Sequence, residues 1–263
     1  MKEVNMTGHL RTFWNRRNLL GELVKKGIKL KYRRSYLGIA WSLLEPLLTT
    51  AVLTIVFGTL FGNKKETFPL YILCGRLLYS FFSQSTKSAA KSIRANASMI
   101  KKVYVPKYLY PLSCILYNYV ITGISLLVLI PLCFYCHVKP TWRMVEVLIP
   151  LLQLFVLTFG FGIILSTITV FFRDMEYLWD VLLMVIMYTS AIFYYPEKLM
   201  KSGYDWILKY NPLYCIIMNF RHAMFGEAMN MHYVLYATGS SIVLAVIGTY
   251  IFYKNQDKFI LAI

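Results

Sequence analysis

The sequence is poor in charge, and above all in acidic residues. Only 15% of its 263 residues are charged, and 28 Lys and Arg stand against 12 Asp and Glu. At the same time 58% of the residues are hydrophobic, and the mean hydropathy is +0.54. A soluble domain cannot bury that much apolar surface, so the composition excludes an ordinary soluble protein and indicates a membrane protein.

Catalytic motifs are missing as well. No Gly is followed by Lys, so the phosphate-binding pattern G-x-x-x-x-G-K-[ST] is absent and the chain has no P-loop of its own. The patterns G-x-S-x-G and H-E-x-x-H are also absent, and the four His are scattered. We therefore expect no catalytic residue, no metal site and no cofactor in this chain.

One cysteine cluster matches a cofactor pattern. The stretch CFYCH, with Cys133, Cys136 and His137, fits the C-x-x-C-H motif of covalent haem attachment. It lies where an apolar run ends, just after Pro131, and too few residues surround it to build a haem pocket. We favour small apolar packing for all five cysteines, with a Cys133–Cys136 disulfide as the lesser alternative.

Long apolar runs are the main positive signal. A helix needs roughly 20 apolar residues to cross the hydrocarbon core of a membrane, and six segments reach that length. We therefore predict an all-α, polytopic membrane protein with six transmembrane helices. The expected spans are residues 38–62, 68–88, 109–136, 143–172, 177–195 and 232–253.

Lys and Arg are distributed unevenly between the predicted loops. The alternate loops that include both termini hold 19 of them, against 8 on the other side. Basic residues concentrate in cytoplasmic loops, so we expect a multi-pass protein of the cytoplasmic (inner) membrane with both termini in the cytoplasm. Because topology accounts for the charge, we expect no nucleic-acid partner. The first 35 residues have no signal-peptide core, so the first span is expected to direct insertion.

Residues 18–31 predict an amphipathic helix lying on an anionic membrane surface, with membrane lipids as its partner. A solvated basic tail is the alternative. We accordingly divide the chain into a cytoplasmic amphipathic interface segment, residues 1–37, and a transmembrane domain, residues 38–263. The apolar face of the helix comprises Leu19, Leu20, Leu23, Val24 and Ile28, and the polar face Glu22, Lys25, Lys26 and Lys29.

Two ionisable residues interrupt the predicted spans. At about 1.5 Å per residue, Glu45 lies about 10 Å from the inner end of the first span, and Arg76 about 12 Å from the outer end of the second. We therefore expect them not to pair. Charges inside a membrane usually face protein or water, so either residue lines a wet passage or is satisfied locally by snorkelling or a hydrogen bond.

Aromatic residues are abundant, with 17 Phe, 21 Tyr and 5 Trp. This exceeds what two interfacial belts require, and aromatic faces pack well against the C–H faces of sugars. Most of these rings are expected to face lipid or to pack in the interior. The candidates for a sugar passage are Trp41, Phe57 and Phe61 in the first span, with Tyr188 and Tyr194 in the fifth.

The segment between the fifth and sixth spans is too apolar for a free loop and too interrupted to cross the membrane. Pro196 and Asn211-Pro212 divide it into two helical pieces. We predict two short re-entrant helices that dip into the outer half of the membrane, where protein or a water-filled cavity must surround their ends.

Residues 94–107, RANASMIKKVYVPK, predict a short cytoplasmic helix between the second and third spans. The segment has four basic residues and no acidic one. Asn96 or Ser98 is suited to cap the helix, and an apolar face without its own membrane needs a protein partner. That face comprises Met99, Ile100 and Val103, with Lys101 beside it and Pro106 fixing the exit into the third span.

Four stretches together resemble one family. They are YRRSYLGIAWSLLEPLL at 32–48, NASMIKKVYVPKYLYPL at 96–112, FFRDMEYLWD at 171–180 and YNPLYCIIMNFR at 210–221. With the spacing of the spans, they make nearly the whole chain similar to the membrane subunits of ABC-2 type exporters. The resemblance is to the polysaccharide and polyol-phosphate exporters that serve O-antigen and teichoic acid export.

This resemblance implies a division of labour. Two copies of the chain would form the path for a lipid-linked glycan, and two copies of a separate ABC ATPase subunit would bind ATP and dock on the helix of residues 94–107. The substrate's pyrophosphate would arrive beside the basic helix, where Lys31, Arg33 and Arg34 would contact either that phosphate or anionic lipid. Glu45 receives no role from the resemblance.

Other functions stay open at this stage. An ABC-2 exporter of drugs or small lipids is the nearest alternative, and a secondary transporter would show internal repeats that we do not find. A membrane-embedded glycosyl- or acyltransferase needs a reactive cluster, and FRDMEYLWD holds the only concentration of acidic residues. We favour a tight turn there, with Arg173 and Asp174 paired to each other or to neighbouring helices.

Overall fold

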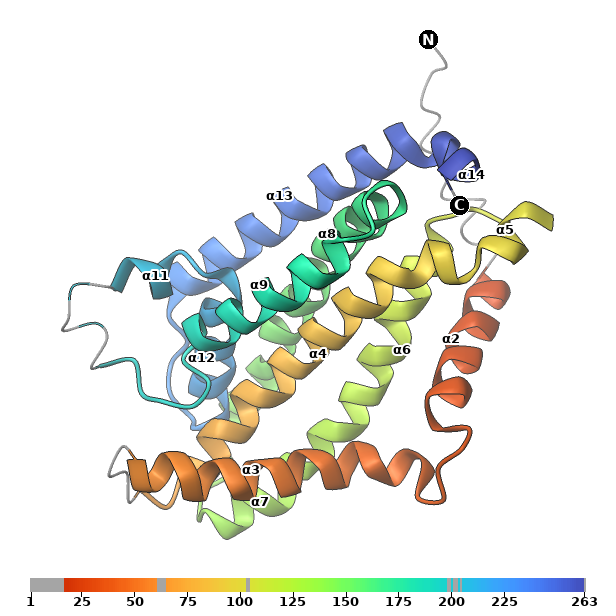
Figure 1. The fold of residues 1–263 in the computed structure, drawn as a ribbon. Coiled ribbons are helices and arrows are strands. Elements are labelled where there is room, and N and C mark those ends of the chain that lie inside the picture. Colours follow the sequence, from red (N-terminus) through yellow and green to blue (C-terminus); the bar gives the residue numbers. More distant parts are fainter. Residues whose placement is uncertain are drawn as a thin grey trace.

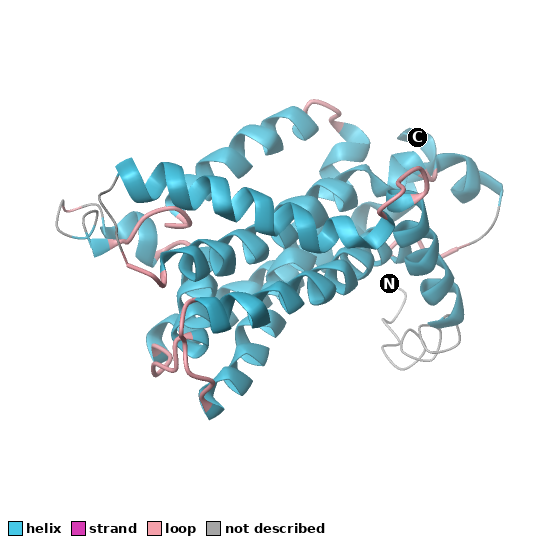
Figure 2. Cartoon of the chain, turned by 90° about the horizontal axis from the view of Figure 1, so that it is seen from below, coloured by secondary structure: helices cyan, strands magenta, loops and turns pink. Residues whose placement is uncertain are grey.

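The computed structural model describes residues 17–60, 65–102, 105–197, 200, 203 and 205–262, and within these ranges every regular element is a helix (Figures 1 and 2). The α-helices are α2 Arg17–Tyr32, α3 Trp41–Leu60, α4 Phe68–Ala95, α5 Ala97–Lys102, α6 Leu109–Ser125, α7 Leu129–Tyr135, α8 Leu148–Phe171, α9 Met175–Thr189, α11 Asp205–Lys209, α12 Pro212–Met224, α13 Met231–Asn255 and α14 Phe259–Ala262. Short 3₁₀ turns cover Gly38–Ala40, Leu126–Val128, Trp142–Val147 and Gln256–Lys258.

Helix α4 forms the centre of the bundle. It contacts α3, α6, α8, α9 and α12 (Figure 1), and Leu70, Ile72, Leu73 and Leu78 are fully buried within it. Helix α3 instead lies along one edge and crosses α4 obliquely (Figure 1). Helix α4 is therefore held mainly by protein, whereas α3 leaves much of its apolar surface uncovered.

Two glycines allow α8 and α13 to pack closely. A Cβ atom on Gly160 would lie 2.8 Å from the backbone N of Ala245, and one on Gly248 would lie 2.8 Å from the carbonyl O of Gly160. Small residues are the usual means of close helix contact inside membranes, where backbones must approach to gain packing energy. The last described membrane-length helix is thus fixed against the middle of the bundle.

Four helical stretches are long and apolar enough to cross a membrane. They agree with the first, third, fourth and sixth predicted spans. The other two predicted spans do not meet the same standard: α4 is not apolar enough over a membrane-crossing length, and α9 has 15 residues, about 22 Å of helix. The count of six therefore stays a prediction. The four stretches are Gly38–Leu60, Leu109–Tyr135, Trp142–Phe171 and Met231–Ala262.

Helix α9 ends six residues before the predicted end of the fifth span at residue 195. The chain leaves the helix at Ser190, and Ala191 takes a left-handed φ of 47°. The side-chain amide of Asn211 donates to the Thr189 carbonyl at 3.3 Å and to the Ser190 hydroxyl at 3.0 Å. These hydrogen bonds replace those that a continuing helix would have made, so the helix can stop inside the protein.

The amphipathic helix predicted at residues 18–31 is confirmed as α2. It packs on α6, where Gly27 lies directly against the ring of Tyr117. Leu20 is buried together with Ile100 of α5 and Phe259 of α14, so α2, α5 and the C-terminal helix meet at one end of the bundle (Figure 1). The placement of α2 on a membrane surface stays a prediction.

The two helical pieces predicted after the fifth span are confirmed as α11 and α12. Asn211 divides them and caps α12, because its side-chain oxygen accepts from the backbone N–H groups of Leu213 and Tyr214. Helix α12 is buried, with Ile216 and Phe220 at 0% exposure. It therefore belongs to the core, and a re-entrant position in the membrane stays a prediction.

Candidate functional site

Glu45 and Arg76 form an ion pair, so the expectation that they would not pair is wrong. Arg76 Nη2 lies 3.7 Å from Glu45 Oε1, and Arg76 Nε donates to Thr49 Oγ1 at 2.8 Å. The depth estimate treated both helices as upright, whereas α3 crosses α4 obliquely (Figure 1). The crossing brings the two side chains to the same place, where each satisfies the other's charge.

The ion pair lines a small pocket of about 100 Å³ between α2, α3, α4 and α6. Trp41, 43% exposed, stands at its wall. Of the sequence-predicted path residues, the structure thus brings Trp41, Glu45 and Arg76 together. The full lining comprises Lys31, Tyr32, Trp41, Ser42, Glu45, Pro46, Arg76, Leu77, Ser80, Phe81, Gln84, Asn118, Ile121, Thr122 and Ser125.

Lys31 reaches from the end of α2 to two amide side chains of the bundle. Its Nζ donates to Gln84 Oε1 at 2.6 Å and to Asn118 Oδ1 at 3.4 Å. Arg33 and Arg34 are exposed, and they line neither this pocket nor the larger pocket that adjoins it. The three basic residues predicted to contact either substrate phosphate or anionic lipid therefore lie in different surroundings.

The remaining predicted path aromatics gather near the end of α9. Phe57 stacks on Phe193 with ring centroids 5.0 Å apart, and Tyr194 donates its hydroxyl to the Tyr188 carbonyl at 2.7 Å. Tyr188 keeps 55% of its surface exposed. These rings do not join Trp41 in one row, and Phe61 lies outside the described residues.

The predicted short helix between the second and third spans is confirmed as α5, with changed roles for two residues. The Asn96 amide donates back to the Ser92 carbonyl at 2.8 Å, so it closes α4 and does not supply a side-chain cap to α5. Ile100 is 8% exposed and packs in the chain's own core, so the expectation that it lacks a partner within the chain is wrong. Met99 is half-buried, and Ser98 and Lys101 are exposed.

Two further residues of that segment, Val103 and Pro106, were also named from the sequence. Pro106 precedes the start of α6 and accepts a backbone hydrogen bond from Leu109 at 3.1 Å. This agrees with its predicted place at the exit into the third span. Val103 lies outside the described residues.

Two acidic residues of α9 form ion pairs with α4. Asp180 pairs with Lys87 at 2.8 Å, and Glu176 pairs with Arg94 at 2.8 Å and with Lys91 at 3.4 Å. The sequence predicted a tight turn in which Arg173 and Asp174 pair with each other or with neighbouring helices, whereas the ion pairs to α4 are made by Glu176 and Asp180. These ion pairs connect α9 to α4, and because their side chains are partly exposed each contributes little to stability.

Sequence reasoning missed Arg221, the largest fully buried side chain among the described residues. Its guanidinium donates to the carbonyls of Tyr71 at 3.1 Å, Ala191 at 3.0 Å and Ile192 at 3.2 Å. The cation also lies 3.4 Å from the centroid of the Tyr71 ring. A lone Arg inside an apolar stretch shortly after Asn-Pro was the signal available in the sequence.

The five cysteines are free thiols, so the Cys133–Cys136 disulfide is not formed in this structure. Cys136 is buried at 3% exposure. His137 follows it with a φ of 52°, at the turn that ends α7. Small apolar packing therefore accounts for this cluster.

Residues 18–225 match the ABC-2 type transporter family, which is well over half of the chain. The chain belongs to the ABC-2 type transporter family. It is 31% identical over 250 residues to the O-antigen export system permease protein RfbA of Klebsiella pneumoniae, covering 92% of this chain and 93% of the relative. It is also 27% identical to the protein of the same name from Myxococcus xanthus, covering 95% and 97%.

A further relative is named for the export of a different polysaccharide. The capsule polysaccharide export inner-membrane protein CtrC of Neisseria meningitidis serogroup B is 23% identical over 84% of this chain and 94% of its own length. An ABC-2 type transporter of this kind is a membrane-embedded permease, and membership of the family implies an ABC ATPase as its partner.

Proposed function

We propose that this ABC-2 permease is the transmembrane subunit of an exporter that moves a lipid-linked polysaccharide, of O-antigen or teichoic acid type, across the cytoplasmic membrane. The observation that carries the proposal is similarity over nearly the full length to permeases named for O-antigen and capsule polysaccharide export. Energy comes from ATP bound by a separate ATPase subunit. The absence of a P-loop sequence supports that division.

The proposed topology has six spans and both termini in the cytoplasm. In it α4 and α9 supply the second and fifth crossings. Three basic residues of α4, Lys87, Lys91 and Arg94, pair with carboxylates of α9, and the fourth, Arg76, pairs with Glu45 of α3. The burial of Leu20, Ile100 and Phe259 in one cluster supports a common cytoplasmic end for α2, α5 and the C-terminus. The excess of Lys and Arg in the same loops supports it independently.

A second copy of the chain is proposed to complete the path. Large apolar side chains are left uncovered on both α3 and α9, and in a membrane they meet either lipid or another protein surface. Cysteines introduced at exposed positions of α3 and α9 should crosslink two copies in membranes, and a complex with one permease copy would contradict the proposal. The uncovered side chains include Leu48, Val52 and Ile55 on α3, and Val181, Met184 and Val185 on α9.

The path itself is proposed to begin at the pocket that holds Trp41 and the Glu45–Arg76 pair. Polar groups facing this opening suit hydroxyl-rich sugars, and Trp41 supplies an aromatic face. Tyr188, which is exposed, and Tyr194 beside it would contact the glycan farther along. This assignment rests on exposure and chemistry, and it gives Phe57, stacked on Phe193, a packing role.

Helix α5 is proposed as the docking point of the ATPase. Because Ile100 is buried in the permease core, the contact must use the outer face with Ser98, Met99 and Lys101. The variant Met99→Asp with Lys101→Glu should release the ATPase in a pull-down while the permease stays inserted. The matched control is Lys258→Glu, an exposed change at the same end of the bundle; equal loss in both variants would show a general charge effect.

Export is tested by deleting the gene from its host and following the glycan. The expected result is a lipid-linked polysaccharide that accumulates inside the cell and disappears from the surface, restored by the gene together with an intact ATPase. A host that displays all its surface polysaccharides normally would contradict the proposal. If drug resistance or a small lipid changed instead, the chain would be an exporter of that other class.

A further inference from the structure

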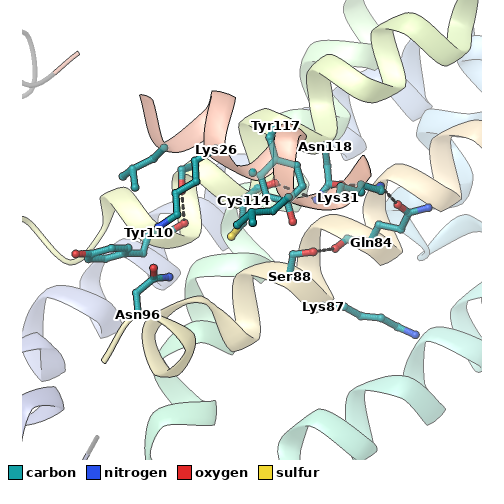
Figure 3. A pocket seen from close by; sticks show the side chains of 14 residues that line it. Lys26, Lys31, Gln84, Lys87, Ser88, Asn96, Tyr110, Cys114, Tyr117 and Asn118 are labelled. Atoms are coloured by element: carbon teal, nitrogen blue, oxygen red, sulfur yellow. Dashed lines mark hydrogen bonds between the residues drawn. The ribbon is translucent and has the colours of Figure 1, made fainter. Parts of the chain in front are cut away.

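A pocket of about 580 Å³ opens where α2 covers α4 and α6 (Figure 3). It adjoins the smaller pocket of the Glu45–Arg76 pair, because Lys31, Gln84 and Asn118 line both. Its walls contain three lysines and no Asp or Glu. The lining residues are Leu23, Lys26, Gly27, Leu30, Lys31, Gln84, Lys87, Ser88, Asn96, Tyr110, Ser113, Cys114, Tyr117 and Asn118.

The three lysines are not equivalent. Lys87 forms an ion pair with Asp180 at 2.8 Å and points away from the other labelled side chains (Figure 3). Lys26 and Lys31 form no ion pair with any side chain in the part of the chain that the structure describes. Two cations of α2 thus remain for a ligand of opposite charge.

Lys31 is oriented by neutral groups. Its ammonium has three N–H donors, and two are directed to the side-chain oxygens of Gln84 and Asn118. Those amides are fixed in turn, since Gln84 donates to Ser80 and Asn118 to the Cys114 carbonyl. The arrangement holds the cation in place without neutralising it and leaves one donor for a ligand.

The surroundings of Lys31 also make its unpaired positive charge less favourable. Burial against the bundle lowers the pKa of Lys31, and the more distant carboxylate of Glu45 offsets this only in part. A cation that has lost part of its hydration gains more from an anion than one on an open surface. Lys31, which lines both pockets and is held by Gln84 and Asn118, is therefore a better placed anchor for an anion than Arg33 and Arg34, which line neither.

Part of the pocket wall is apolar. Leu23 and Leu30 of α2 and the ring of Tyr117 on α6 contribute to it, and Leu30 is 55% exposed. The volume lies in the range that holds an organic ligand and exceeds what a lone inorganic ion fills. Lysines and apolar side chains lining the same pocket suit a molecule with an anionic head and a hydrocarbon part.

We propose that this pocket binds the phosphate head of a membrane amphiphile, with Lys31 and Lys26 contacting the phosphate. Charge-assisted hydrogen bonds from ammonium to phosphate are the strong contacts, and the leucines accommodate the first part of the lipid chain. The same phosphate chemistry belongs to bulk anionic phospholipid and to a lipid-linked diphosphate glycan. The second source rests on the proposed export function, whereas the phosphate site does not.

The test is a binding titration of the purified permease–ATPase complex in neutral detergent. The probes are short-chain phosphatidylglycerol, phosphatidylcholine with the same chains, and farnesyl diphosphate. Lys31→Gln should weaken binding of an anionic probe by about tenfold, the loss of one charge-assisted contact, and Lys26→Gln should weaken it less. Lys31→Arg should retain most of the affinity, since it keeps the charge.

Lys29→Gln is the matched control, because Lys29 is an exposed lysine of the same helix that lines neither pocket. Equal weakening by Lys29→Gln and Lys31→Gln, or no weakening by Lys31→Gln, would overturn the site. Co-purification of the ATPase and an unchanged unfolding temperature establish that each variant is folded.

The probes then distinguish the source of the phosphate. Preference for phosphatidylglycerol assigns the pocket to bulk lipid, and preference for the diphosphate assigns it to the transported lipid, and both support the phosphate site. Loss of binding in Lys31→Gln with normal polysaccharide export removes the substrate as the source and leaves the export function standing. Failure of the gene deletion to affect export removes that function and leaves the site standing.

Discussion

Replacing Arg221 by Met should destabilise the protein far more than replacing Arg76 by Met. Arg221 is 1% exposed, and its guanidinium satisfies the carbonyls of Tyr71, Ala191 and Ile192 at 3.0–3.2 Å. A buried polar group left without its partner costs about 1–3 kcal/mol. Three such acceptors give a loss of about 3 kcal/mol even at the low end of that range.

The comparison residue lies in a wetter place. The side chain of Glu45, which pairs with Arg76, is 57% exposed, and the pair opens to a pocket. Exposed ion pairs contribute about 0–1 kcal/mol. Arg221→Lys should give an intermediate loss, because an ammonium keeps the charge but cannot match the fork that reaches three carbonyls at once.

The assay uses the buried thiols as reporters of unfolding. Cys74 and Cys215 are fully buried, so a thiol-reactive fluorophore labels them only when the bundle opens. By the scaling of globular proteins, about 3 kcal/mol lowers the unfolding temperature by roughly 6–12 °C. If the unfolding temperature fell no further for Arg221→Met than for Arg76→Met, the three hydrogen bonds of Arg221 would not be a main source of stability.

Three further changes test the packing. Gly248→Ala should cost about 1–3 kcal/mol, because its Cβ would press on the backbone of α8, whereas Gly239→Ala on the same helix meets nothing within 4 Å and should be neutral by the same unfolding assay. Asn211→Ala should cost about 1 kcal/mol or more through the lost cap of α12; an unchanged unfolding temperature would exclude that role. Glu176→Gln should lower stability by less than about 1 kcal/mol, since its ion pairs are partly exposed, and a larger drop would show that they fix α9.

Hydrophobic length and periodicity predicted the helices well. Four of the expected spans appear, the first, third and fourth within two residues of the expected bounds and the sixth continuing to Ala262, and α2 covers the predicted residues 18–31. These features depend on local sequence, because the length of an apolar run or the pattern of an amphipathic helix is enough to predict a place in the membrane or at its surface. The early end of α9 could not be predicted in this way, since it depends on Asn211 and Arg221 far along the chain.

The candidate site was predicted only in part, for a related reason. Trp41, Glu45 and Arg76 were named from their own chemistry, and the structure brings them to one pocket. Glu45 and Arg76 pair because α3 crosses α4. Counting residues along two upright helices cannot predict that crossing. Ile100 shows the converse, since an apolar residue in a basic segment predicted an outside partner, and the chain's own core supplies that partner.

Polar side chains inside the bundle bond to groups on neighbouring helices. Their roles therefore cannot be predicted from each residue's own position in the sequence. In hydrocarbon an unsatisfied donor or charge is expensive, so each polar side chain needs a partner, and neighbouring helices are where partners are found. Lys31 meets Gln84 and Asn118, and Arg221 meets the carbonyls that follow α9. The two arrangements differ in one respect that matters for function. Arg221 is enclosed by the groups it satisfies, whereas Lys31 retains an open pocket beside it, so the first suits a structural clamp and the second a binding site.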